Sequence, residues 1–273
     1  MAAGQSRPAE RGMKAAHSMQ QDWDERARKN PFFYIASWRK DWNEEAFFES
    51  GQQDYERLVA DALVRRGFSP HAKSMIEVGC GAGRMTRAFA RKFGSVTACD
   101  LSSEMLSRAQ ALCRTEKNIT WVQGNGTDLG FIASGSADFV FSYLVLQHMP
   151  KEEIVHHYIR EMLRVLRDGG LCLFQFNGSH EKNMNWRGRA TWTLIDALYV
   201  VRLRSAAKRL ARALGLDPEM AGKTWHGVAV PASNIIRTVR DSGGADVEVW
   251  GENTPMAWCC ASKSTSSRQT PNA

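Results

Sequence analysis

The sequence predicts an α/β fold in which a parallel sheet is covered by helices on both faces. Short apolar runs suited to strands alternate with helix-period stretches through residues 74–177. This alternation is typical of a parallel sheet, because each crossover connection packs a helix onto one face. A glycine-rich turn directly after the first run is the second observation. The length of 273 residues suits one such domain with an insertion rather than two independent domains.

Composition is that of an ordinary globular protein, with 43% hydrophobic and 24% charged residues. The net charge of +7 suits a basic surface, an anionic substrate or nucleic acid. The six cysteines show no CxxC pair and no metal-ligand spacing, so we expect no metal site and interpret them as reduced core residues. The sequence shows no signal peptide and no uncharged apolar stretch of the ~20 residues that a membrane span needs. We therefore expect a cytoplasmic protein.

Four segments follow from the composition along the chain. Residues 1–20 are small and polar and predict a disordered N-terminus, and residues 263–273 predict a disordered tail. Residues 21–70 are dense in aromatic side chains and predict a helical lid, whose last helix ends at Gly67. The α/β domain occupies residues 71–262.

Within this domain each strand is expected where an apolar run of five to seven residues occurs. The helix at 151–167 is the clearest, because acidic residues fill its first turn and Gly169 and Gly170 follow its end. The predicted strands are 74–78, 95–99, 119–123, 137–143, 171–176, 245–250 and 256–261, and the predicted helices are 83–93, 102–113, 151–167 and 231–242.

An insertion at 183–227 interrupts this pattern and is helical in its middle. Between Met184 and Lys223 it holds eight Lys and Arg residues against three Asp and Glu residues. Five of the seven net positive charges therefore lie here. Its apolar residues, among them Leu194, Ile195 and Leu198, form a face that has to be buried.

The glycine-rich turn has the form E-x-G-x-G-x-G, with Glu77 followed by Gly79, Gly81 and Gly83. Glycines allow a tight turn and let a ligand approach the backbone closely, and a following helix would offer unpaired N–H groups. The dinucleotide fingerprint needs a glycine where this chain has Arg84, and a phosphate loop would end in Gly-Lys-Ser/Thr. Both alternatives are therefore excluded.

Two further positions suit the binding of a nucleoside. Asp100 ends the second strand, where a carboxylate can accept both hydroxyls of a ribose. Its alternative role is to begin the next helix, although Ser102 is the better cap. Asn125 and Asp128 lie in "QGNGTDLGF" after the third strand, where an adenine could be held. The alternative there is a turn without a ligand, because Asn-Gly is a strong turn signal.

Four stretches together, "IEVGCGAGRMTRAFA", Asp100, "GNGTDL" and "ADFVFSYLVLQHMP", resemble the class I S-adenosylmethionine-dependent methyltransferases. The likeness is greatest to the small-molecule group that includes the ubiquinone and menaquinone biosynthesis enzymes. It covers residues 70–177 well and 228–262 loosely. The resemblance implies a Rossmann-like three-layer sandwich with a mostly parallel seven-stranded sheet and an antiparallel last strand. It also implies S-adenosylmethionine as cofactor, and the insertion, after the fifth strand, as a substrate lid.

The resemblance also implies a role for individual residues. Glu77, Gly79, Cys80 and Gly81 would border the methionine part of the cofactor, and Asp100 would hold the ribose. Asn125 would grip the adenine in place of the commoner aspartate. The full implied cofactor set is Glu77, Gly79, Cys80, Gly81, Gly83, Asp100, Leu101, Met105, Asn125, Gly126, Thr127, Ser142 and Tyr143.

Methyl transfer from a sulfonium is an in-line displacement, so positioning can supply much of the rate, and a base is needed only when the acceptor holds its proton. His148, just beyond the fourth strand, is the candidate base, and Tyr34 is its candidate partner from the N-terminal segment. The alternatives are a structural loop histidine and an aromatic lid residue without a chemical role.

The sequence therefore predicts a methyltransferase acting on oxygen, nitrogen or carbon of a small aromatic or hydrophobic metabolite. We expect a small-molecule acceptor as partner rather than nucleic acid. The sequence does not decide between a monomer and a homodimer. One alternative is an RNA or protein methyltransferase that uses the basic insertion, with Trp186 and Trp192 as stacking residues. The other is a protein of the same fold that catalyses a different reaction, such as a cyclisation.

Overall fold

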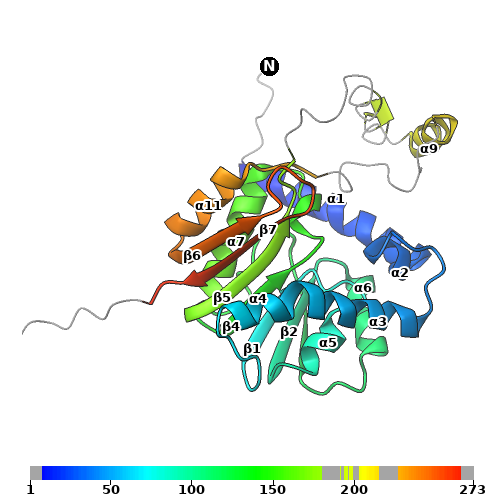
Figure 1. Ribbon diagram of the computed structural model, residues 1–273. Coiled ribbons are helices and arrows are strands. Elements are labelled where there is room, and N and C mark those ends of the chain that lie inside the picture. Colours follow the sequence, from blue (N-terminus) through cyan, green and yellow to red (C-terminus); the bar gives the residue numbers. More distant parts are fainter. Residues whose placement is uncertain are drawn as a thin grey trace, which may run out of the picture.

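The computed structural model describes residues 8–179, 203–214 and 227–265, with residues 191, 194, 195, 197 and 198 between them. Its centre is a seven-stranded sheet in the order β3-β2-β1-β4-β5-β7-β6 (Figure 1). β7 runs antiparallel to both of its neighbours, and the pairs from β3 to β5 are parallel. The predicted α/β sandwich with an antiparallel last strand is confirmed.

The strands follow the apolar runs closely, except that β5 begins five residues before the predicted start. Here α7 passes directly into the strand, and the two glycines lie within a bulge opposite the start of β4. Gly169 has a φ of +74°, so it bends the strand instead of only ending the helix. The strands are β1 (Ser74–Val78), β2 (Ser95–Asp100), β3 (Ile119–Gln123), β4 (Ala137–Ser142), β5 (Leu166–Phe176), β6 (Gly244–Trp250) and β7 (Ala257–Lys263).

Helices cover both faces of the sheet, and each face has its own apolar core. One continuous helical run begins in α3 (Glu44–Asp54), passes through a π-helical stretch, η1 (Tyr55–Ala60), and ends in α4 (Asp61–Arg65). It lies on the same face as α5 (Thr86–Ala90) and α6 (Ser103–Leu112), and α7 (Glu152–Val165) and α11 (Ala232–Asp241) lie on the other (Figure 1).

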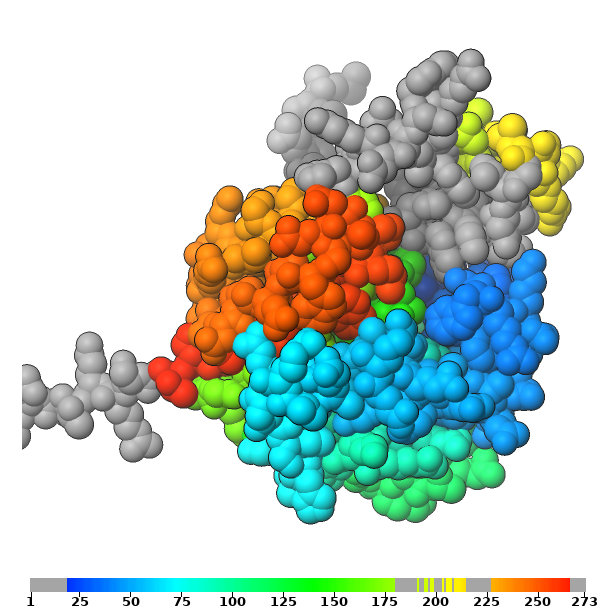
Figure 2. All heavy atoms as spheres, viewed as in Figure 1, coloured from blue at the N-terminus to red at the C-terminus, as the bar shows by residue number. Residues whose placement is uncertain are grey.

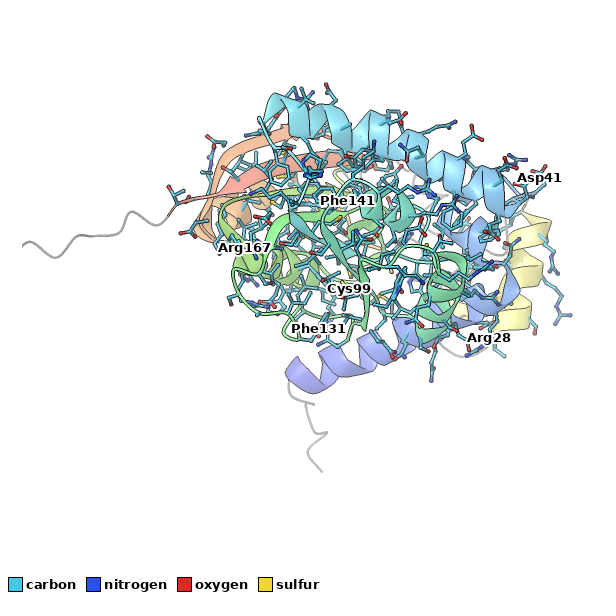
Figure 3. All side chains as sticks on the ribbon, turned by 90° about the horizontal axis from the view of Figure 1, so that it is seen from below. Arg28, Asp41, Cys99, Phe131, Phe141 and Arg167 are labelled. Atoms are coloured by element: carbon cyan, nitrogen blue, oxygen red, sulfur yellow. The ribbon has the colours of Figure 1, made fainter. Side chains whose placement is uncertain are left out.

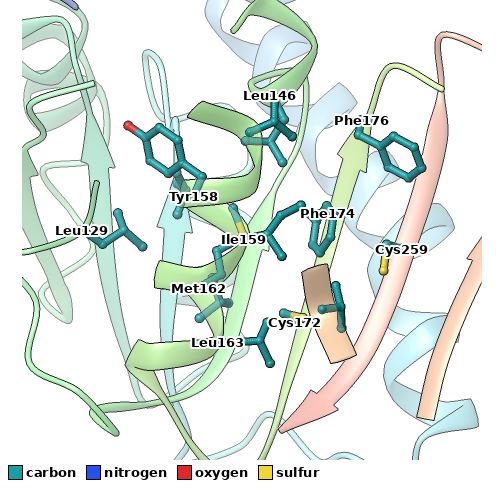
Figure 4. Close-up of a cluster of buried hydrophobic side chains, with 14 of the residues drawn as sticks. Leu129, Leu146, Tyr158, Ile159, Met162, Leu163, Cys172, Phe174, Phe176 and Cys259 are labelled. Carbon is teal, nitrogen blue, oxygen red and sulfur yellow. The ribbon is translucent and has the colours of Figure 1, made fainter. Parts of the chain in front are cut away.

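Successive side chains of each strand point to opposite faces of the sheet, so each strand contributes to both cores. On β4, Phe139 and Phe141 point toward the α4 side and Val140 toward α7. Figure 4 shows the second core, in which Ile159 and Met162 of α7 pack against the strands. Both cores are fully enclosed, which makes the sheet a rigid support for the loops at its edge.

The helix after the glycine-rich turn is shorter than predicted. α5 begins at Thr86, whereas the predicted helix began at residue 83. Gly81 and Gly83 have φ values of +54° and +85°, which a right-handed helix does not contain. The turn therefore extends through residue 85, and the prediction of a helix N-terminus directly beside the glycines is wrong.

The N-terminal segment is ordered further than predicted. Helix α1 (Pro8–Lys29) replaces most of the expected disorder in residues 1–20, and Met19 is only 3% exposed. Met19 and Trp23 lie one turn apart, so one face of α1 packs on the α7-side core. α1 crosses the side of the sheet opposite the α3–α4 run (Figure 3), and α2 (Pro31–Ile35) follows it.

The remaining predicted segments lie partly outside the described residues. Of the insertion at 183–227, the structure describes helix α9 (Arg204–Ala213) and a few neighbours, with Ala207 and Ala211 packed beside Ile195. Trp186 and Trp192 lie outside the described residues, as do residues 1–7 and 266–273. β7 continues to Lys263, one residue into the predicted tail. None of the helices in the described ranges is long and apolar enough to cross a membrane.

The contact between α3 and the glycine-rich turn yields a test of the packing. A Cβ on Gly51 would lie 2.0 Å from the carbonyl oxygen of Arg84. Helix propensity alone predicts that Gly51→Ala stabilises the protein by about 1 kcal/mol. We expect instead a destabilisation of roughly 1–3 kcal/mol in urea unfolding, because the overpacked backbone has to shift.

The matched control for this test is Gln53→Ala on the exposed face of the same helix, which changes stability by no more than about 0.5 kcal/mol. A Gly51→Ala protein more stable than the wild type would show that α3 does not pack closely on this turn.

Candidate active site

The glycine-rich turn is tied to the end of β2 by its backbone. The N–H groups of Gly79 and Cys80 both donate to the carbonyl of Cys99, at 2.7 and 3.0 Å. A Cβ on Gly79 would lie 2.1 Å from Val145, and one on Gly81 would lie 2.7 Å from Ile35. The glycines are therefore required by close packing of the turn against two side chains that themselves line a cavity.

Asp100 lies at the centre of this region. Its Oδ2 accepts from the N–H of Gly81 at 2.8 Å, and its Oδ1 accepts from the N–H of Ser102 at 2.9 Å. Burial raises the pKa of Asp100, and these backbone hydrogen bonds oppose that shift. Ser102 caps α6 by accepting from Met105, and its hydroxyl donates to Asp24 of α1. The cap is thus Ser102, and Asp100 faces the cavity.

The turn after β3 differs from the prediction. The Asn125 side chain closes the turn on itself, because its Oδ1 accepts from the N–H groups of Thr127 and Asp128 and its Nδ2 donates to Asp128. Asn125 and Thr127 do not line the cavity, whereas Gly126 and Asp128 do. Burial of the Asp128 carboxyl is outweighed by hydrogen bonds from Gly130, Asn125 and Thr127, so its pKa is lowered. Asp128, rather than Asn125, brings an ionised oxygen to the cavity.

The two predicted residues at the end of β4, Ser142 and Tyr143, point in different directions. Ser142 is fully buried and its hydroxyl donates to the carbonyl of Val78 at 3.2 Å, so it joins two strands and does not line the cavity. Tyr143 lines the cavity and stacks on Trp258, with 5.2 Å between the ring centroids. The next residue, Leu144, has a φ of +59°, which is a strained conformation for a leucine. Strain of this kind often accompanies functional sites.

His148 ends a short 3₁₀ helix, η2 (Leu146–His148), and its side chain is buried beside Trp23 of α1, with the rings edge to face at 5.3 Å. A chain of amides reaches its ring. The side-chain oxygen of Gln175, Oε1, accepts from the N–H of Leu144. The other polar atom of the Gln175 side chain is therefore the donor nitrogen, Nε2. That Nε2 donates to Oε1 of Gln147, whose own Nε2 lies 3.2 Å from Nε2 of His148. Nε2 of His148 therefore accepts a hydrogen bond.

One cavity of about 1090 Å³ joins these groups at the carboxyl ends of β1, β2 and β4. It lies where the strand order reverses between β1 and β4, the usual ligand site of such sheets. The N-terminal segment and the loop between β6 and β7 both contribute to its lining. Figure 2 shows the N-terminal segment, in blue, and the C-terminal strands, in orange and red, on the two sides of one face. Eleven predicted residues line the cavity: Tyr34, Glu77, Gly79, Cys80, Gly81, Asp100, Leu101, Met105, Gly126, Tyr143 and His148.

Four predicted residues stay outside the cavity lining, namely Gly83, Asn125, Thr127 and Ser142. Gly83 is packed against α6, because a Cβ there would lie 3.0 Å from the sulfur of Cys113. The lining residues that sequence reasoning missed include Trp23, Trp38, Arg84 and Gln147, whereas Asp128 was a candidate beside Asn125. The aromatic density of the N-terminal segment was the available signal for the two tryptophans.

Glu77 is the most unusual acid of the site. It is 4% exposed, and its Oε2 accepts from the hydroxyl of Thr86 at 2.6 Å. Burial raises the pKa of Glu77 to about 8, although the Thr86 hydroxyl and the charge of Arg84 oppose the shift. Without a ligand, Glu77 is thus largely protonated at neutral pH.

Among the described residues there is no group of three or more His, Cys, Asp or Glu side chains able to hold a metal ion.

Comparison with known proteins gives consistent matches. Residues 76–174 match the family described as the methyltransferase domain. Demethylmenaquinone methyltransferase of Tropheryma whipplei (strain Twist) is 31% identical over 147 residues, covering 54% of each chain, so this chain spans about half the length of that relative. Malonyl-[acyl-carrier protein] O-methyltransferase of Enterobacter lignolyticus is 31% identical over 192 residues, covering 70% of this chain and 71% of that one.

A solved structure with this fold is magnesium protoporphyrin IX methyltransferase from Synechocystis PCC 6803 with bound SAH. Its TM-score is 0.58 at 18% identity, over 92% of this chain and all of that one.

The pKa of Glu77 leads to a prediction about stability. The value in the folded protein lies above that of an unfolded glutamate, so the folded state holds an extra proton between pH 4.5 and about 8. Stability therefore falls as the pH rises through this interval. We expect ligand-free protein to lose on the order of 2 kcal/mol of unfolding free energy between pH 6 and pH 9 from this group.

Urea unfolding of Glu77→Gln at both pH values checks this, because the variant lacks the titration and loses correspondingly less stability. Glu49→Gln, at an exposed position, is the control and keeps the wild-type dependence. An identical pH dependence in wild type and Glu77→Gln would mean that Glu77 is ionised in the folded protein.

Proposed function

This chain belongs to the class I S-adenosylmethionine-dependent methyltransferases, and we propose that it methylates an oxygen, nitrogen or carbon atom of a small aromatic or hydrophobic acceptor. The observation that carries the proposal is the cavity that joins the glycine-rich turn and Asp100 to aromatic rings and His148. A cofactor and an acceptor can both fit there. Its volume of about 1090 Å³ lies just above the roughly 300–1,000 Å³ typical of ligand pockets.

The residues present fit the cofactor. Each carboxylate oxygen of Asp100 accepts one backbone N–H, and each keeps acceptor capacity for a ribose hydroxyl. Asp128 adds an acceptor at the next strand, and Leu101 and Leu129 supply apolar surface beside it, which suits a purine with an amino group. When bound, S-adenosylmethionine supplies an activated methyl group on a sulfonium. The protein has to align the acceptor, exclude water and remove a proton where the acceptor carries one.

His148 is suited to the proton step. The Gln147 amide is oriented to donate to Nε2 of His148, and this hydrogen bond favours the tautomer with a lone pair on that nitrogen, which a base requires. Gln175 is fully buried and fixes the Gln147 amide, so the arrangement does not depend on solvent. We propose that an acceptor hydroxyl or amine displaces the Gln147 contact and passes its proton to Nε2. Tyr34 lines the same cavity, where it can position the acceptor.

The choice of acceptor class rests on the apolar walls and on the relatives. Trp23, Trp38, Phe131 and Met256 add apolar surface to the cavity lining. By their names, the relatives described above methylate demethylmenaquinone and a malonyl-[acyl-carrier protein]. The aromatic surface of this cavity favours the first kind of acceptor, a phenol or hydroquinone with an apolar substituent.

The direct test is consumption of S-adenosylmethionine. Purified protein is incubated with the cofactor and a set of phenols, hydroquinones and hydrophobic carboxylic acids, and S-adenosylhomocysteine and the methylated product are measured by mass spectrometry. We expect turnover with at least one aromatic acceptor. Cofactor that binds without ever being consumed would contradict the proposal.

Asp100 provides a test of cofactor binding. Asp100→Asn should weaken the binding of S-adenosylhomocysteine by roughly 1–3 kcal/mol in calorimetry, because an acceptor for two hydroxyls is lost. Since burial raises the pKa of Asp100 and only the ionised carboxylate accepts both hydroxyls, wild-type affinity should fall toward acid pH. Asp100→Asn should lack that dependence. Asp61→Asn, at an exposed position of α4, should behave as wild type, and equal affinities for all three proteins would remove Asp100 from the binding site.

His148 provides a test of the proton step. With a phenolic acceptor, His148→Ala should lower kcat by roughly 10²–10⁴-fold at neutral pH. Raising the pH should recover part of the rate, because a phenolate needs no base. A variant with near-normal kcat and an unchanged pH profile would show that positioning alone drives the transfer.

A further inference from the structure

The cavity contains one permanent cation whose role the proposed function leaves open. Arg84 directly follows the glycine-rich turn, lines the cavity and is only 3% exposed. Among the described residues of the cavity lining it is the only lysine or arginine. A buried guanidinium requires both charge compensation and hydrogen-bond acceptors.

The partners of Arg84 satisfy only one side of its guanidinium. Nη1 lies 2.8 Å from Oδ2 of Asp54 and donates to the hydroxyl of Ser50 at 3.3 Å. Its buried Nε has no hydrogen-bond partner within the part of the chain that the structure describes. A buried donor without an acceptor is costly and rare in native proteins. The edge that carries Nε is therefore available to a ligand.

Charge compensation is also incomplete. Asp54 is shared, because its Oδ1 lies 2.7 Å from Nη2 of Arg57. Two guanidinium groups therefore face one carboxylate, which leaves a net charge of +1. Glu77, the other acid near Arg84, is protonated at neutral pH, since burial raises its pKa to about 8. A monoanion would complete the cluster.

The surroundings of Arg84 strengthen its attraction for an anion. The guanidinium carbon lies 5.3 Å from the ring centre of Trp38 and 5.9 Å from that of Tyr143, and both rings line the cavity. At such distances the ring faces attract a guanidinium group and help to hold it in place. Gly51 lets α3 lie directly against the Arg84 backbone, so the position is rigid. The planar edge of an arginine pairs with a carboxylate through two parallel hydrogen bonds.

We propose that Arg84 binds a carboxylate inside this cavity, through the guanidinium edge that Asp54 and Ser50 leave open. The carboxylate has two possible sources, the amino-acid end of the cofactor or an acidic acceptor, and the chemistry is the same for both. The inference rests on the proposed function, because it names the chemistry of a ligand for that site.

Binding measurements with pairs of ligands that differ in the carboxylate test the proposal. In the first arm, calorimetry compares S-adenosylhomocysteine with its decarboxylated analogue, which keeps the ammonium group and lacks the carboxylate. In the second arm, protein saturated with S-adenosylhomocysteine is titrated with benzoate and with benzamide. Wild type should prefer the carboxylate in at least one pair by about 10- to 100-fold, as for a charged hydrogen-bonded pair.

Arg84→Gln should lose that preference because binding of the carboxylate member weakens, and its affinity for benzamide should stay that of the wild type. Loss in the first arm identifies the cofactor as the source, and loss in the second identifies the acceptor. Arg84→Lys, which can keep the ion pair with Asp54, serves if Arg84→Gln does not fold, and it should also lose most of the preference. Ser50→Ala removes only the hydroxyl contact at Nη1 and should keep the wild-type preference.

Unchanged carboxylate preference in both arms of the folded variants, or no preference in wild type, would overturn the proposal and leave Arg84 with a structural role toward Asp54. Because these measurements follow binding, they are independent of turnover. A protein that binds carboxylates through Arg84 but consumes no S-adenosylmethionine would contradict the proposed function and not this inference.

Discussion

The hydrogen bonds between the glycine-rich turn and the end of β2 are the contacts on which the rest of the site depends. Two successive N–H groups donate to the carbonyl of Cys99, and the N–H of Gly81 donates to the side chain of Asp100. The parallel pairing of β1 and β2 brings the two strand ends to one edge. Positive φ values at Gly79 and Gly81 then turn the backbone so that its donors face β2. The turn and the carboxylate are thereby fixed side by side before any ligand binds.

Burial of this edge makes every polar group in it depend on a specific partner. Burial raises the pKa of Asp100 while backbone donors oppose that shift, Glu77 keeps its proton, and Arg84 is compensated only in part by Asp54. The same low-polarity environment strengthens any interaction that a charged ligand makes with these groups. The ligand-free cavity is thus preorganised for a molecule with hydroxyls at one end and charges at the other, with an aromatic surface beside it.

The strands and most of the candidate cofactor residues could be predicted from the sequence, because both depend on local patterns. An apolar run of five residues between turns becomes a buried strand, and residues at strand ends meet at one edge of a parallel sheet. Side-chain direction could not be predicted in this way. Asn125 and Asp128 lie three residues apart on one turn, and which of them faces the cavity depends on the hydrogen bonds that close the turn. Ser142 and Tyr143 are adjacent and point to opposite sides.

The sequence by itself determined the α/β fold, the ligand-binding edge and the resemblance to a cofactor family, since these follow from periodicity and from glycines with an acidic residue at a set distance. Only the tertiary structure decided which groups share the cavity. Arg84 was visible in the sequence as the residue that breaks a dinucleotide motif, yet its importance comes from Asp54, Trp38 and Tyr143, which belong to other segments. Burial and the pairing of charges are properties of the assembled fold. A sequence pattern cannot specify them, because the residues that create them are distant along the chain.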